Sequence, residues 1–475
     1  RMIEGAVDAG SNVTASTLVW VEAHDTSDAI ATVDSVAVAV GLTGAAIGVG
    51  LAENTMTAIT RAHVSDSLVH AEGGEIRIDA DATQDVQADA SVVAVTAAIG
   101  AAGAGGHAVT DLDSTVEAYA HNASLTASGN LFIDADSNHT SRAETFGLGA
   151  ALGFAVSVMI SEASIGGATR AFADGATSVN VDSAVQITAD STASALPDGT
   201  SISVGLISGA VAKVDAAGDR VTEAYAGARA GTAPGALTTL ALGTDDLSIA
   251  ATSIYTANAS PIGLSFGLLG SAAVTLSTAG ITGATLAYVG EKATVTAGEL
   301  DVVANSTENA TANNVVVALS AGLSVAVSDS TATIDSDTEA FTGVRAGESP
   351  TAGAQTVITL TDAGNGDGTA VIDADGSRTT TASATGGAAS FGISVAAMLP
   401  TADTSGTVRA YAGQGTVLTA DDLTITADAD TMTADATILA GSISGLTSVN
   451  VLESLAKVTG EVEAFIGAQA DDVSS

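Results

Sequence analysis

Clustered oxygen ligands at one point of the sequence indicate a candidate cation site. Asn365-Gly366-Asp367-Gly368 is followed closely by Asp373-Ala374-Asp375-Gly376. Calcium prefers carboxylate and carbonyl oxygens, and glycines permit the sharp turns that bring such ligands together. The segment lacks the EF-hand spacing with its closing Glu, and it lacks the tandem repeats of calcium β-rolls. Calcium is therefore the one cofactor that we predict, with Asp367, Asp373 and Asp375 as its candidate ligands.

Carboxylates also recur along the chain, each directly after an Ile/Val-x-Ala motif. The residue that follows the motif is acidic at Asp81, Asp136, Asp190, Asp375 and Asp428. Stacked repeats would align these side chains in a file. One interpretation is a row of cation ligands. The other is an Asx-turn at the end of a strand, which Asn305 and Thr252 could also supply, and the pattern favours the turn.

Catalytic patterns are not evident. The sequence contains no nucleophile elbow, phosphate-binding loop or HExxH motif. Polysaccharide-cleaving enzymes place carboxylates in one cleft, whereas the acidic residues here follow the repeat. His63 and His70 share one segment and could bind a metal, but two histidines without further ligands are more typical of a surface. We predict that the protein is not an enzyme.

An Ala followed by a large side chain recurs along the whole chain. The pairs are Ala58-Ile59, Ala118-Tyr119, Ala171-Phe172, Ala224-Tyr225, Ala287-Tyr288, Ala340-Phe341, Ala410-Tyr411 and Ala464-Phe465. Successive pairs lie 60, 53, 53, 63, 53, 70 and 54 residues apart, a period typical of repeat architectures. The pairs predict about eight repeats in one continuous solenoid, approximately residues 1–58, 59–118, 119–171, 172–224, 225–287, 288–340, 341–410 and 411–465.

The aromatic residues of these pairs predict a structural ladder. Its members are Tyr119, Phe172, Tyr225, Tyr288, Phe341, Tyr411 and Phe465. We expect the rings to stack repeat on repeat as a mostly buried core ladder. Exposed rings at Tyr119, Tyr225 and Tyr288 would instead indicate a sugar-binding stripe.

Length variation is confined to one part of the repeat. The distance from the Ile/Val-x-Ala motif to the next Ala-large pair stays between 38 and 41 residues. The remaining variation in repeat length falls in the connection that follows the pair. This connection is long at 61–74, 228–246 and 344–370. Two of these connections begin alike, with Arg229-Ala230-Gly231 and Arg345-Ala346-Gly347. They are either tolerated surface loops or one face that contacts a partner.

Composition and periodicity indicate strands. Val, Thr, Ile and Gly are dense, and apolar residues alternate with polar ones, as in Val185-Gln186-Ile187-Thr188-Ala189. In the repeat that begins near Val116 we expect five or six short strands, ending near Ala168. The fold class predicted is all-β: a right-handed parallel β-helix, or β-solenoid, of about eight repeats of ~53 residues. Each repeat would form two small coils or one large coil.

Charge restricts the partners. The formal net charge is −41, from 54 acidic and 13 basic residues, which excludes nucleic acid and disfavours anionic lipid. The chain has no cysteine and therefore no disulfide. Apolar runs such as Phe146–Ile160 and Val92–Val109 approach the length of a membrane span. We interpret them as strand pairs buried on both faces rather than as transmembrane helices, and we expect no membrane insertion.

The repeat pattern resembles that of a known group of proteins. Ala224-Tyr225-Ala226-Gly227, Ala287-Tyr288-Val289-Gly290 and Ala410-Tyr411-Ala412-Gly413 share the form Ala-Tyr-x-Gly, and Val-Thr-Ala and Ile-x-Ala strands follow. This pattern is similar to the repeats of giant bacterial surface proteins of the filamentous-haemagglutinin and large-adhesin kind. The resemblance implies a parallel β-helix exported to the cell surface, where it serves adhesion, cell–cell contact or an extracellular fibre.

Two functions follow as hypotheses. The first is an extracellular structural segment of a cell-surface fibre or filament, whose partners are neighbouring copies or flanking repeats of a longer array. The second is an adhesin stalk that presents the loops 61–74, 228–246 and 344–370 to a surface carbohydrate or protein. Runs such as Val315–Val327 are apolar on both faces and require a second layer, from the same chain or another.

Overall fold

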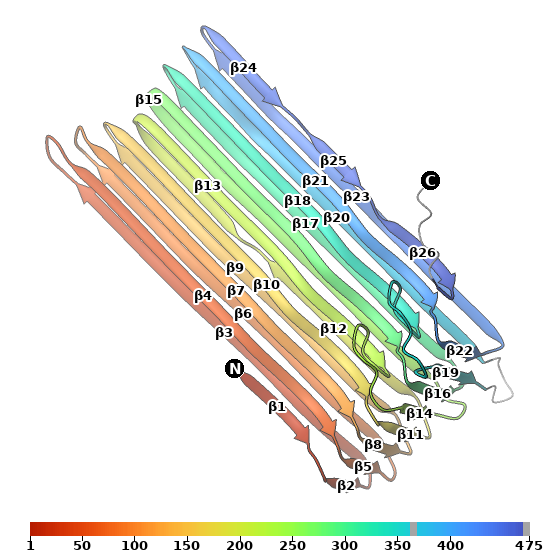
Figure 1. The fold of residues 1–475 in the computed structure, drawn as a ribbon. Coiled ribbons are helices and arrows are strands. Elements are labelled where there is room, and N and C mark those ends of the chain that lie inside the picture. Colours follow the sequence, from red (N-terminus) through yellow and green to blue (C-terminus); the bar gives the residue numbers. More distant parts are fainter. Residues whose placement is uncertain (362–367, 469–475) are drawn as a thin grey trace.

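The computed structural model describes residues 1–361 and 368–468, and within them every regular element is a β-strand. Figure 1 shows the strands stacked side by side in a long, flat solenoid. Each repeat forms a single coil, in which two long strands are joined by a tight turn and a short strand closes the other end. We call the turn end the tip and the short-strand end the base.

The two long strands of each coil form two walls that face each other. Wall A contains β3 (Leu18–Ala39), β6 (Glu75–Thr96), β9 (Leu131–Ala151), β12 (Val185–Ala195), β17 (Leu300–Ser320), β20 (Thr369–Ser390) and β23 (Asp422–Ser444). Wall B contains β1 (Met2–Val7), β4 (Ala45–Ser65), β7 (Ala101–His121), β10 (Phe154–Asp174), β18 (Leu323–Thr342), β21 (Ile393–Ala412), β24 (Thr447–Leu452), β25 (Leu455–Val458) and β26 (Glu461–Ile466). Two strands, β13 (Asp198–Ala226) and β15 (Leu247–Val289), continue round the tip and belong to both walls.

The base is a separate sheet of eight short strands. They are β2 (Asn12–Ala15), β5 (Leu68–Ala71), β8 (Ser124–Ala127), β11 (Ser178–Val181), β14 (Thr238–Ala241), β16 (Ala293–Ala297), β19 (Thr356–Leu360) and β22 (Thr416–Thr419). Every pairing in both sheets is parallel and joins a strand to its equivalent one repeat away. The all-β parallel solenoid predicted from the sequence is therefore confirmed.

The internal geometry of the repeat differs from the expectation. The five or six short strands expected from near Val116 to near Ala168 are not found, because β9 alone runs without interruption through 21 residues. Asp136 and Asn138 point outward from this strand, whereas Ser137 and Ser141 are buried between the walls. One coil per repeat makes each wall about 70 Å long in the strand direction, whereas eight coils stack over only ~40 Å.

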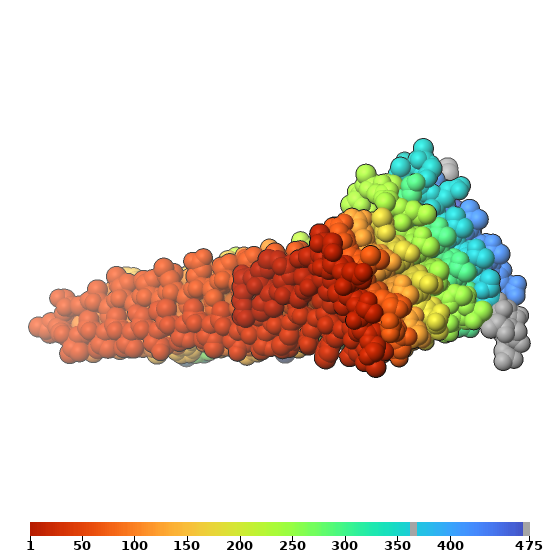
Figure 2. Space-filling view, turned by 90° about the horizontal axis from the view of Figure 1, so that it is seen from below, coloured from red at the N-terminus to blue at the C-terminus, as the bar shows by residue number. Residues whose placement is uncertain are grey.

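The space between the walls narrows from base to tip. Near the base the core contains Ile78, Leu131 and Val295, all fully buried. Toward the tip the facing residues become Ala, Ser and Gly, and the walls approach closely. A Cβ added at Gly149 would lie 2.7 Å from the carbonyl oxygen of Val156 on the facing wall. The molecule is accordingly wedge-shaped, as the space-filling view shows (Figure 2).

Charged and polar groups interrupt the core midway along the walls. Arg378 is fully buried, and its Nε donates to Glu308 at 3.1 Å and to Ser336 at 3.0 Å. Arg220 is 1% exposed and donates to the carbonyl oxygen of Ser114. Burial, and then the positive charge of Arg220, lower the pKa of His139 to about 3. This imidazole is therefore neutral inside the fold at ordinary pH.

The buried ion pair gives a test of this core. We expect Glu308→Ala to destabilise the protein by about 3–5 kcal/mol, because it leaves the Arg378 guanidinium buried without a counter-charge. The double variant Glu308→Leu/Arg378→Met should recover most of the loss. Urea unfolding of both variants measures the difference. A double variant as unstable as the single one would contradict the ion pair as the reason for the loss.

Candidate functional site

The aromatic residues form one continuous stack along wall B. Neighbouring rings from Tyr119 to Phe465 lie 4.6–5.1 Å apart between centroids, with interplanar angles of 2–7°. The stack lies on the outer face of the wall, however, not in the core between the walls. Ala118 and Ala120 are fully buried and point inward, so that Tyr119 between them must point outward. The rings thus stack repeat on repeat as predicted, but the buried cluster that they form lies outside the walls rather than between them.

The first ring of the stack is His63, and the first Ala-large pair of the register is therefore Ala62-His63 rather than Ala58-Ile59. His63 pairs with Tyr119 in the parallel register, and the two rings lie 4.8 Å apart, whereas Ile59 pairs with Thr115. Consequently 61–74 is not an insertion, because β4 passes directly into β5 as in the unextended repeats. Ala62-His63 has the same Ala-large pattern as the other pairs and could have revealed this register from the sequence.

A file of alternating charges runs beside the rings, two residues earlier on the same strands. Its aligned members are Arg61, Glu117, Arg170, Glu223, Leu286, Glu339, Arg409 and Glu463. Arg170 contacts Glu117 and Glu223, each at 3.2 Å, and Arg409 contacts Glu463 at 2.9 Å. From Arg61 to Glu223, and again from Glu339 to Glu463, each charge therefore lies beside a charge of opposite sign, a pairing that stabilises this register. The alternation was visible in the sequence but was not recognised there.

The alternation breaks at Leu286, where an arginine would be expected between two glutamates. The missing positive charge comes from the two long loops after β13 and β18. Arg229 contacts Glu223 at 2.8 Å, and Arg345 contacts Glu339 at 2.7 Å. This explains why the two loops begin with the same Arg-Ala-Gly sequence.

The same motif ties each loop to a ring of the next coil. The Ala230 N–H donates to the Tyr288 hydroxyl at 3.0 Å, and that hydroxyl donates to Glu223 at 2.5 Å. The second loop repeats the arrangement with Ala346, Tyr411 and Glu339, at 2.8 Å for both bonds. Burial, and then the negative charge of Glu223, raise the pKa of Tyr288. Its hydroxyl therefore stays protonated and can donate.

The loops cover the ladder rather than expose it. Tyr225 is 2% exposed, and Tyr288, Phe341 and Tyr411 are fully buried. The two loops also contact each other, since Glu348 accepts the Gly231 N–H at 3.1 Å. The space left between them is only about 10 Å³. A sugar-binding stripe on Tyr119, Tyr225 and Tyr288 is therefore not available, because only Tyr119 remains partly exposed.

The aligned aspartates form the predicted file, but not in turns. Asp81, Asp136 and Asp190 occupy one register line on the outer face of wall A, in the middle of β6, β9 and β12. The Asx-turn interpretation is wrong, because no strand ends there. Partial withdrawal from water, followed by repulsion from Asp190 and the other acidic neighbours, raises the pKa of Asp136 to about 6.

The candidate calcium ligands are only partly described. Asp367 lies outside the described residues, while Asp373 and Asp375 point outward from β20. Burial raises the pKa of both. Within residues 1–361 and 368–468, no three acidic or histidine side chains converge on a common point where a metal could bind. Of the two histidines, His63 joins the ring stack and His70 lies on β5 in the base sheet. Calcium stays a prediction.

Comparison of the chain with protein-family models, with curated proteins and with solved structures found no match. The resemblance to filamentous-haemagglutinin repeats thus depends on sequence pattern alone. Among the described residues there is no helix that could cross a membrane.

The loop anchor can be tested at one hydroxyl. Tyr288→Phe leaves the buried Glu223 and the Ala230 N–H without this partner, and we expect it to cost about 1–3 kcal/mol. Faster amide exchange at Ala230 and a lower urea midpoint would show the loss. Tyr225→Phe is the matched control, because the Tyr225 hydroxyl has no hydrogen bond to another described residue. Equal effects of the two variants would contradict the anchor.

The aspartate file predicts a pH dependence. Because the folded-state pKa of Asp136 lies above its value of 3.8 in the unfolded chain, the folded form binds this proton more tightly. Its contribution to stability is therefore largest below the unfolded value and is lost as pH rises toward about 6.

We expect Asp136→Asn to raise stability at pH 7 and to flatten the decline between about pH 4 and 6. Thermal unfolding at a series of pH values, compared with the wild type at each pH, measures the effect. Asp182→Asn changes an exposed carboxylate outside the file and should leave the profile as in the wild type. An Asp136→Asn profile parallel to that of the wild type would contradict the repulsive file.

Proposed function

We propose that this chain is a non-catalytic structural segment of a bacterial cell-surface fibre. The observation that supports this best is the outer ladder. Its rings and alternating charges fix each coil against the next, and the long loops serve the same ladder. The two long loops, which are the main departures from the repeat, thus also hold neighbouring coils together. Such cohesion between coils is what a load-bearing stack requires.

The stack also has the mechanical properties of a stalk. Each coil contacts only its neighbours through long parallel strands, so length can be added by repeats without a new core. High negative charge keeps such a surface soluble, and it is tolerated in saline surroundings, where charges are screened. The absence of cysteine is compatible with export of an extracellular chain.

Electron microscopy of the source cells tests the proposal. Antibodies raised against this chain, carried on gold particles, should label fibres that project from the cell surface. Labelling confined to the cytoplasm would overturn it. Pre-adsorption of the antibodies with the purified chain is the control for specificity.

One observation favours an adhesin function as a second candidate. The two loops project beyond the outer face of the walls (Figure 2), and residues 231–233 and 349–353 of their crests are exposed. We propose that these crests could contact a surface carbohydrate or protein, the role expected for 228–246 and 344–370. The segment 61–74 has no such crest, and it is therefore not part of this proposed binding face.

The crests can be changed while the contacts of the loops with the ladder stay in place, although the Thr351 hydroxyl loses its bond to Glu291. Replacing 232–234 and 349–353 by Gly-Ser linkers keeps Arg229, Ala230, Arg345 and Ala346 in place. If the crests bind a surface carbohydrate or protein, beads coated with this variant should lose adhesion to cells that carry it. Adhesion equal to that of beads with the unchanged chain would contradict the adhesin function and leave the fibre function standing.

A further inference from the structure

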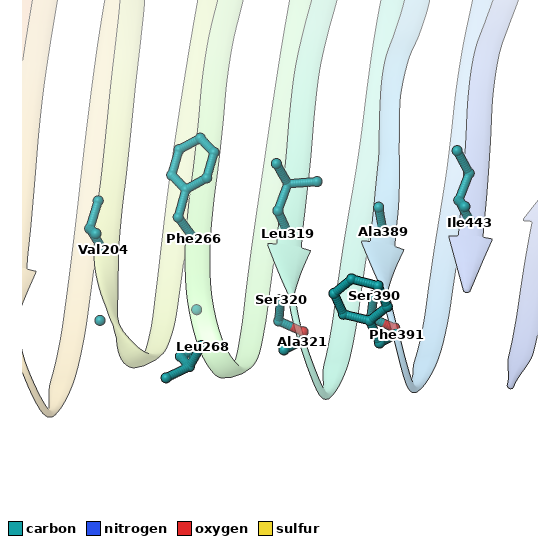
Figure 3. Close-up of a pocket in the computed structure, with 12 residues that line it drawn as sticks. Val204, Phe266, Leu268, Leu319, Ser320, Ala321, Ala389, Ser390, Phe391 and Ile443 are labelled. Carbon is teal, nitrogen blue, oxygen red and sulfur yellow. The ribbon is translucent and has the colours of Figure 1, made fainter. Parts of the chain in front are cut away.

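The tip of the wedge carries large apolar side chains where a turn in water would carry polar ones. Leu152, Leu268, Phe391 and Leu446 occupy the turns between the walls, and they are 62–82% exposed. Turns that face water are usually built from Gly, Pro, Asn, Asp and Ser. Figure 3 shows Leu268 and Phe391 at two of these turns, with the turn that contains Ala321 between them.

Apolar side chains continue from the turns onto the outer faces of both walls. On wall A, Val204, Phe266, Leu319 and Ile443 belong to one register line, which lines a groove of about 650 Å³ beside the turns (Figure 3). This line contains only apolar residues from Val38 to Ile443. On wall B the corresponding region exposes Phe154, Val156, Leu323 and Ile393. The edge and both flanks of the wedge are thus apolar.

The inside of the tip, by contrast, is lined next to the turns by small residues, mainly Ala, Gly and Ser. Ser265 and Ser324 point between the walls and are fully buried. Ser208 and Ser265 share a hydrogen bond of 2.7 Å across the interior. Small Ser, Ala and Gly residues inside with Val, Leu and Phe outside is the reverse of the arrangement that water favours. It is the arrangement expected where the surroundings of the tip are themselves apolar.

Charges are excluded from the same region in every coil. The stretches around the tips that contain no Asp, Glu, Lys or Arg are 35–52, 90–110, 145–161, 199–212, 247–290, 309–328, 379–402 and 436–452. The net charge of −41 is therefore borne by the parts of the coils nearer the base. The charge of the whole chain disfavours a membrane, but the fold places this charge away from the tip.

Backbone N–H groups at the turns of the tip have hydrogen-bond partners within the protein, so that they do not require water. At the turns the Phe154 N–H donates to Gly100, the Ala321 N–H to Leu268 and the Ile393 N–H to Gly322, at 2.9–3.0 Å. Backbone groups that enter hydrocarbon need such internal partners. From Val315 to the turn the strand extends about 20 Å, comparable with one leaflet of a hydrocarbon core ~30 Å thick.

We propose that the apolar tip inserts edge-first into the surface of a lipid bilayer. A second copy of the chain would cover one flank of the wedge, whereas a lipid phase covers the edge and both flanks at once. Since the remainder of the chain is strongly acidic, the lipid recognised is zwitterionic rather than anionic. This inference does not depend on the fibre function.

Flotation with phosphatidylcholine vesicles tests the proposal on the full 475-residue chain. We expect the protein to float with these vesicles, and to float less when anionic lipid is added at low salt. The variant Leu268→Ser/Leu269→Ser/Phe391→Ser should reduce partition at least about tenfold, because three exposed apolar side chains lose their transfer energy. Leu68→Ser/Leu237→Ser is the matched control, since it removes exposed leucines near the base, and it should partition as the wild type does.

Fluorescence locates the part of the molecule that enters the lipid. The only tryptophan, Trp20, lies near the base end of β3. In a Trp20→Phe background, Phe391→Trp should shift its emission to the blue when vesicles are added, whereas Trp20 in the unchanged chain should not shift. No flotation would overturn the proposal. A dimer by sedimentation that the triple serine variant disrupts, without vesicle binding, would assign the tip to self-association instead.

Discussion

The parallel register between coils is the constraint on which the rest of this structure depends. Each residue lies beside its equivalents one repeat before and after, at the spacing of hydrogen-bonded strands. A side-chain type that recurs with the repeat therefore becomes a continuous file. Stacked rings, alternating charges and aligned carboxylates are all consequences of this one geometric rule, and their energies add along the stack because every coil repeats the contact.

The files have opposite effects on stability. The ring stack and the Arg–Glu file attract, and their alternation favours one register over its neighbours. The aspartate file repels, as the raised pKa of Asp136 shows. Cohesion is concentrated on wall B and strengthened there by Arg229 and Arg345, while wall A carries repulsion that the backbone ladder must overcome. Side chains on wall B thus hold neighbouring coils together, whereas the aspartates on wall A push them apart.

Two regions of the coil solve different packing problems. Near the base the walls diverge, and branched side chains with the short strands fill the space. Toward the tip the walls converge until only Gly, Ala and Ser fit between them. The larger apolar residues of the tip are forced outward, because the strand offers only two faces. The exposed apolar edge is therefore coupled to the thinness of the wedge.

The sequence by itself determined the all-β repeat, the location of the insertions after β13 and β18, and the alignment of the aromatic residues. These follow from periodicity, which depends only on the order of residues. Tertiary structure decided which face each file occupies. Ala118 and Tyr119 are adjacent and both recur, so the pattern alone could not show which of them points inward. The length of β9, the place of His63 and the closing of the loops over Tyr288 likewise depend on how far apart the two walls lie. That distance is set by the packing of residues remote in sequence.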